Sequence, residues 1–86
     1  MTTVTVLVRY FASARAASGV DEEKVQLPAG ASVADLVSEL RETRSQALSR
    51  VLDAASFLLD GVAVRDRALA LPADAEIDVL PPFAGG

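Results

Sequence analysis

The sequence predicts a small α+β domain in which a mixed sheet of about five strands packs on one main helix. Residues 3–11 and 76–80 alternate between apolar and other side chains, which is the period of a strand with one buried face. Residues 33–40 carry apolar side chains at i, i+3, i+4 and i+7, which is the period of an amphipathic helix. The chain has 86 residues, which is the length of a single domain.

The first strand is predicted from TVTVLVRYF, residues 3–11, where valine occupies every second position from Val4 to Val8. If these valines face the core, continued alternation turns Tyr10 inward and Phe11 outward. An outward Phe11 would suit a docking surface. The alternative is that Phe11 ends the strand as an ordinary core residue.

A second strand is predicted over Glu23–Leu27, because EEKVQLP is bounded by Pro28 and Gly30. The preceding ASARAASG is rich in alanine and predicts a turn of helix or a loop that stops at Gly19. The acidic run at residues 21–23 is interpreted as a solvated turn. The short connection between the two strands favours a hairpin.

The main helix is predicted from SVADLVSELRE. Ser32 is a good N-cap, and Asp35 follows three residues later in a capping-box arrangement. The apolar stripe consists of Val33, Leu36, Val37 and Leu40. A second, shorter helical stretch covers Ala47–Leu52.

Three further strands are expected in the second half of the chain. SFLLDGVAV predicts two short strands joined at Asp60-Gly61, a dipeptide typical of tight hairpins, with Phe57 in the core. A turn is expected at residues 72–74, before a last strand over Glu76–Leu80. Pro81 ends that strand because it has no N–H to donate to a neighbour.

The resulting order, β, β, α, β, β, β, suits the β-grasp or ubiquitin-like arrangement, although periodicity does not determine the order of strands in the sheet. We expect a β-grasp domain over residues 1–80, followed by an extended and flexible C-terminal tail over residues 81–86.

The composition excludes several classes of function. The chain has no histidine and no cysteine, so it lacks the usual general base and thiol nucleophile, and no metal site is expected. We therefore expect no enzyme in the chain by itself. The net charge of −4 argues against nucleic acid as a partner. No apolar run approaches the length of a membrane span, and Arg9 interrupts the only stretch that resembles a signal peptide, so a cytoplasmic location is expected.

The closing segment VLPPFAGG suggests a chemical role for the main chain. Pro81 and Pro82 favour an extended exit from the domain. Gly85 and Gly86 lack a Cβ, so this end could enter a narrow slot, with the α-carboxylate of Gly86 unshielded. Activated as an acyl adenylate by another enzyme, such a carboxylate can accept sulfur and become a thiocarboxylate. Terminal fraying, or prolines that merely block edge pairing, is the alternative interpretation.

Several stretches together resemble the MoaD/ThiS sulfur carriers, ubiquitin-like proteins that end in Gly-Gly, and in particular the molybdopterin synthase small-subunit branch of that family. They are RYFASARAASG, ASVADLVSEL, LLDGVAV and ADAEIDVLPPFAGG, in family order. The resemblance implies that an E1-like, MoeB-like adenylyltransferase uses ATP to activate Gly86, and that a sulfur donor then converts it to a thiocarboxylate. A MoaE-like large subunit of molybdopterin synthase would receive the tail, and the sulfur would pass to cyclic pyranopterin monophosphate. No cofactor bound to this chain is implied.

The resemblance also implies roles for individual residues. Gly86 matches the sulfur-bearing position, with Gly85 beside it, and Pro81 and Pro82 match the stalk of the tail. Phe83 stands where the family usually has a smaller residue. The positions that match the partner-binding patch or its border are Phe11, Arg15 and Leu80.

Two alternatives stay open at this point. The first is a sulfur carrier that serves cysteine or thiamine synthesis. The second is a ubiquitin-like modifier or a plain interaction domain.

Overall fold

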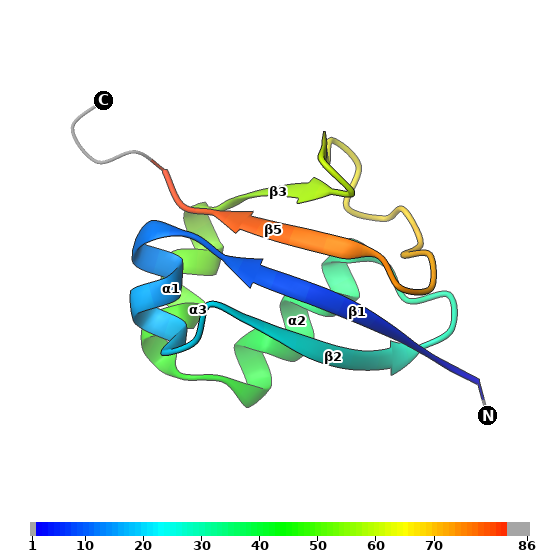
Figure 1. The fold of residues 1–86 in the computed structure, drawn as a ribbon, viewed down its shortest axis with the longest axis horizontal. Helices are drawn as coiled ribbons and strands as arrows, with labels where there is room; N and C mark the ends of the chain where they lie inside the picture. Colours follow the sequence, from blue (N-terminus) through cyan, green and yellow to red (C-terminus); the bar gives the residue numbers. More distant parts are fainter. Residues whose placement is uncertain (1, 83–86) are drawn as a thin grey trace.

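The computed structural model describes residues 2–82 of the chain (Figure 1). Strands and helices follow the order β1 (Thr3–Tyr10), α1 (Ala12–Ser18), β2 (Glu22–Pro28), α2 (Val33–Thr43), α3 (Gln46–Ala54), β3 (Ser56–Leu59), β4 (Val62–Ala63) and β5 (Glu76–Leu80).

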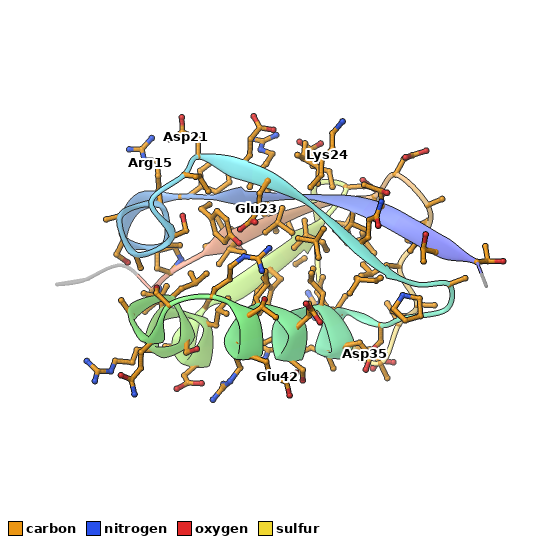
Figure 2. The ribbon with its side chains drawn as sticks, turned by 90° about the horizontal axis from the view of Figure 1, so that it is seen from below. Arg15, Asp21, Glu23, Lys24, Asp35 and Glu42 are labelled. Carbon is orange, nitrogen blue, oxygen red and sulfur yellow. The ribbon has the colours of Figure 1, made fainter. Side chains whose placement is uncertain are left out.

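The five strands form one mixed sheet in the order β2-β1-β5-β3-β4. β1 and β5 lie in the middle and run parallel, whereas the other neighbours are antiparallel. The helices cover one face of this sheet (Figures 1 and 2). The predicted α+β class and the β-grasp, ubiquitin-like fold are therefore confirmed.

The core lies between the sheet and the helices, where the sequence patterns predicted it. Val6, Val8 and Tyr10 of β1 are buried, and so is the apolar stripe of α2. β5 contributes Ile77 and Val79, both fully buried, and β3 contributes the buried Phe57. One face of each central strand thus supplies the apolar surface that the helices cover.

The helical layer is larger than the sequence patterns predicted. The alanine-rich segment is a regular helix, α1, which ends at Gly19 with a left-handed φ of 81° and the Gly19 N–H donating to the Arg15 carbonyl. α3 also extends beyond the predicted Ala47–Leu52 at both ends. The two helices are joined where the Ser45 hydroxyl donates to the Ala17 carbonyl at 3.2 Å. Because α1 lies between β1 and β2, these strands are antiparallel neighbours but not a tight hairpin.

The acidic run at residues 21–23 is not simply a solvated turn, and that interpretation was wrong for Glu23. β2 begins at Glu22, so strand alternation turns Glu23 toward the helices. Glu23 accepts a hydrogen bond from the Tyr10 hydroxyl at 2.6 Å and another from Arg44 Nη2 at 2.7 Å. The bond from Arg44 lowers the pKa of the Glu23 carboxyl. The group therefore stays charged while it joins β1, β2 and the end of α2.

The local turn and capping signals are confirmed. The Ser32 hydroxyl accepts from the Asp35 N–H at 3.1 Å, and Asp35 Oδ2 accepts from the Ser32 N–H at 2.9 Å, which completes the capping box of α2. Asp60 and Gly61 have φ of 48° and 85°, so both central residues of the β3–β4 turn lie in the left-handed region that a tight hairpin requires.

Within residues 2–82, no helix is long and apolar enough to span a membrane. The same residues hold no group of three histidine, cysteine or acidic side chains placed to bind a metal ion.

Candidate functional site at the end of the central strands

The parallel pairing of β1 and β5 brings the C-terminal ends of both strands to the same edge of the sheet. Tyr10 lies opposite Val79, and the Phe11 N–H donates to the Val79 carbonyl at 3.3 Å. β5 ends one residue later, at Leu80, and the chain leaves the sheet beside α1 (Figure 1). Residues far apart in the sequence therefore meet where the tail begins.

Phe11 lies at the start of α1 and is half-buried, whereas the adjacent Tyr10 is only 3% exposed. The prediction that Tyr10 turns inward and Phe11 outward is thus confirmed. The Arg9 guanidinium lies 5.2 Å from the centroid of the Phe11 ring, which is within the range of a cation–π interaction. The ring is held in place from one side and leaves apolar surface available beside the start of the tail.

A charged cluster on the outer face of the sheet supports this aromatic residue. Arg9 Nη1 lies 2.5 Å from Glu76 Oε1, and Arg9 Nε lies 3.3 Å from Asp78 Oδ1. Burial raises the pKa of the Asp78 carboxyl, and the charge of Arg9 opposes that rise. Asp78 Oδ1 accepts no hydrogen bond from any described residue, so Arg9 is the nearby charge that compensates it.

Sequence reasoning missed this cluster. Alternation places Arg9 on the outer face, as it does Glu76 and Asp78, and that signal is visible in the sequence. The register that sets Arg9 opposite Asp78 comes from the parallel β1–β5 pairing, which joins residues 69 positions apart. No local pattern predicts such a pairing.

A cavity of about 310 Å³ opens next to Phe11, between the end of β1, α1 and the start of β2. Arg15 lines it, with its Nε 3.8 Å from Asp21 Oδ1 (Figure 2). Both side chains are mostly exposed, so this ion pair is weak, and Arg15 keeps hydrogen-bond donors available to a partner. Arg15 therefore lies beside Phe11, at the position that the resemblance assigned to the patch or its border.

The remaining predicted site residues lie at the end of β5 and after it. Leu80 and Pro81 are half-buried, and Pro82 is exposed. Phe83, Gly85 and Gly86 lie outside the described residues. The structure thus brings Phe11, Arg15 and the base of the tail to one end of the molecule, and this arrangement can present a chain end to another protein.

Comparison with known families identifies the chain. The model of the ThiS family matches residues 8–86, which include the whole segment from β5 to Gly86. The chain belongs to the ThiS family. It is a small ubiquitin-like protein of the ThiS/MoaD sulfur-carrier type, as the resemblance implied.

Three solved structures of similar proteins share the fold. A Pyrococcus furiosus protein provisionally named molybdopterin converting factor subunit 1 is 28% identical, with a TM-score of 0.78, covering 93% of this chain and 99% of that one. SAMP1 of Haloferax volcanii is 27% identical, with a TM-score of 0.82. The match covers 95% of this chain and 99% of SAMP1. A chain in the Helicobacter pylori complex of molybdopterin-converting factor subunits 1 and 2 is 24% identical, with a TM-score of 0.69. The match covers 96% of this chain and 100% of that one, and this likeness supports the fold alone. The comparison with curated proteins finds no significant match.

Proposed function

We propose that this ThiS-family chain is the sulfur-carrying small subunit of a molybdopterin synthase. The observation that carries the proposal is the family match, which extends through Gly85 and Gly86. The resemblance to the Pyrococcus furiosus protein supports the molybdopterin pathway in particular. The geometry is also consistent with it, because Phe11 and Arg15 flank the start of the tail and offer a partner an apolar and a charged contact.

The proposed chemistry needs no catalytic side chain from this protein. A carboxylate oxygen of Gly86 attacks the α-phosphate of ATP in an adenylating enzyme, which forms the acyl adenylate and releases pyrophosphate. Hydrosulfide released by a sulfur donor then attacks the acyl carbon and expels AMP, which leaves a thiocarboxylate and a proton. The large synthase subunit then receives the tail and catalyses sulfur transfer to the pterin precursor. The absence of histidine and cysteine from the sequence is compatible with this division of labour.

Intact-mass analysis tests the sulfur-carrier role directly. After incubation with an adenylating enzyme, ATP and a sulfur source, we expect the mass increase of one oxygen-to-sulfur exchange, located at Gly86 by fragmentation. A chain lacking Gly85 and Gly86 should show no such increase and should unfold at the same temperature. Sulfur incorporation in the truncated chain would refute Gly86 as the carrier position.

Co-purification from the native cytoplasm identifies the pathway. A pterin-binding large subunit is expected, whereas a pyridoxal-phosphate synthase or a thiazole synthase would assign the carrier to cysteine or thiamine synthesis.

Phe11→Ala tests the docking end of the molecule. Removing this half-buried ring should weaken binding to the large subunit by about tenfold or more, because aromatic anchors at interfaces are commonly worth 2 kcal/mol or more. Val62→Ala is the matched control, since Val62 is 69% exposed on β4, at the far edge of the sheet. Calorimetric titration of both variants should separate them, and equal affinities would contradict a role for Phe11 in docking.

A modifier function is the second candidate. The resemblance to SAMP1 of Haloferax volcanii, whose full name is small archaeal modifier protein 1, favours it. This function requires that Gly86 forms isopeptide bonds with lysines of target proteins. Tryptic peptides of target proteins that carry the C-terminal remnant of this chain on lysine would support the modifier function. If such peptides are absent from cells that contain the thiocarboxylate form, the result would contradict the modifier function and favour the sulfur-carrier function.

A further inference from the structure

β2 forms a free edge of the sheet, because it pairs only with β1 among residues 2–82. The Tyr10 N–H donates to the Asp21 carbonyl at 2.8 Å, and the Ala29 N–H donates to the Thr2 carbonyl at 3.1 Å. In an antiparallel pair, successive residues alternately direct their main-chain groups toward the partner strand and away from it. The odd-numbered residues of β2 therefore bond β1, and the even-numbered ones direct N–H and C=O groups away from the sheet. The outward residues that carry an N–H are Glu22, Lys24 and Gln26, whereas Pro28 has no N–H and its carbonyl already accepts from the Ala31 N–H.

The side chains of these three residues are exposed, and an exposed edge with unpaired main-chain groups can pair with another strand. A second copy of this chain is a poor candidate for that strand. Antiparallel self-pairing centred on Lys24 would set that charge opposite its own copy, and the two chains would each carry a net charge of −4. The occupant should therefore differ in charge from this protein.

A groove of about 460 Å³ lies beside the end of β2, which is at the opposite end of the sheet from the end of β5 (Figure 1). Its apolar lining includes Leu27 and Ala31, and its acidic lining consists of Asp35 and Glu39 of α2. Figure 2 shows Asp35 and Glu42 on α2, whereas Lys24 points to the other side of the sheet. The groove is thus an acidic surface next to the free edge.

The acidic residues of α2 form no ion pair among residues 2–82, although the charge of Arg44 acts on Glu39 at longer range. Asp35, Glu39 and Glu42 are spaced i, i+4 and i+7 and lie on one face of the helix. The arginines at the end of α2 are engaged elsewhere, since Arg41 pairs with Asp53 and Arg44 pairs with Glu23. No ion pair involves Glu39 or Glu42 within the described part of the chain. Carboxylates one turn apart repel each other, and a bound cationic segment would relieve that repulsion.

We propose that the free edge of β2, together with this groove, binds an extended basic segment of a partner protein as an additional strand. The main chain of the segment would bond the outward groups of Lys24 and Gln26. Every second side chain would then point toward α2, where the stem of a lysine or arginine can pack on Leu27 and its charge can reach Glu39. This surface is separate from the docking end of the tail, so the proposal goes beyond the proposed function.

Hydrogen exchange measured by NMR tests the main-chain pairing. The probe is a capped peptide, Thr-Lys-Val-Lys-Val-Lys-Thr, added to the full chain, and the control peptide has glutamate in place of each lysine. We expect the lysine peptide alone to slow exchange at the Lys24 and Gln26 amides, since those of the odd-numbered residues are already bonded to β1. Binding without new protection at these two amides, or equal binding of the glutamate peptide, would overturn the proposal, as would protection that arises without peptide through self-association.

Matched substitutions test the two parts of the site. Gln26→Pro removes an N–H that faces away from β1, so the fold should persist while affinity for the lysine peptide falls about tenfold; Gln26→Ala keeps the N–H and should bind as the parent does. Glu39→Gln should weaken binding of the lysine peptide about threefold. Glu42→Gln removes the same charge outside the groove lining and should have a smaller effect.

A dispersed NMR spectrum verifies folding of each variant. Unchanged affinity in folded Gln26→Pro, or equal losses for the two glutamine variants, would refute the site.

Discussion

At the scale of single residues, Tyr10 and Glu23 show how one hydrogen bond can make stability depend on pH. Tyr10 is buried in the core, yet its hydroxyl reaches Glu23 at 2.6 Å. Burial, reinforced by this hydrogen bond, raises the pKa of the Tyr10 phenol above its usual value of 10. The folded state therefore holds the proton more tightly than the unfolded chain. This contribution to stability is fully present below pH 10 and is lost as pH rises toward the pKa of the folded state.

An alkaline titration checks this behaviour. Tyr10 is the only tyrosine and the chain has no tryptophan, so phenolate absorbance reports this residue alone. We expect Tyr10 to ionise together with unfolding, above pH 10, when absorbance and circular dichroism are followed in the same sample. Tyr10→Phe should lower the free energy of unfolding at neutral pH by about 2 kcal/mol. As the pH rises above 10, the variant should lose less stability than the parent chain, because it has no phenol to ionise. Phenolate absorbance in a chain that is still folded would contradict the expectation.

At the scale of elements, α2 is defined by its first turn and by the face it buries. The reciprocal hydrogen bonds between Ser32 and Asp35 satisfy main-chain donors that the start of a helix leaves free. The same helix buries Val33, Leu36, Val37 and Leu40 against the sheet. Its start is therefore specified locally, and its position is specified by packing.

Ser32→Ala should lower the free energy of unfolding by about 1 kcal/mol, because it removes the hydroxyl that accepts from the Asp35 N–H. Ser38→Ala is the matched control, since Ser38 is exposed within α2 and alanine is the better helix former there. Urea denaturation of both variants measures the difference. Equal stability of the two would show that the capping box contributes little.

At the scale of the whole molecule, the last strand of the chain, β5, occupies the central position of the sheet. β5 pairs with β1 on one side and with β3 on the other, and its Ile77 and Val79 are fully buried. Each such side chain contributes about 1.5–3 kcal/mol on burial, which is a large fraction of the stability of a small domain. The proposed sulfur-carrying tail therefore begins directly after a strand that we expect the fold to require.

Two truncations test this dependence. A chain ending at Pro82 keeps every described pairing and should match the thermal unfolding midpoint of the full chain. A chain ending at Ala75 lacks β5, and its amide NMR spectrum should show the narrow dispersion of an unfolded protein. A folded spectrum for the shorter chain would show that the central position of β5 is not required.

Local patterns in the sequence determined much of this protein. Alternation predicted β1 and the opposite orientations of Tyr10 and Phe11, and the capping box with its apolar stripe predicted α2, because these features depend on residues a few positions apart. The chemistry proposed for Gly86 likewise follows from the sequence. The tertiary structure alone decided that β5 inserts beside β1, which brings Phe11 to the start of the tail. It also decided that Arg9 pairs with Asp78. The hydrogen bonds by which Glu23 joins Tyr10 to Arg44 were decided in the same way. These contacts join residues 13 to 69 positions apart, and they form because the sheet and helices must bury their apolar faces together, which no local pattern encodes.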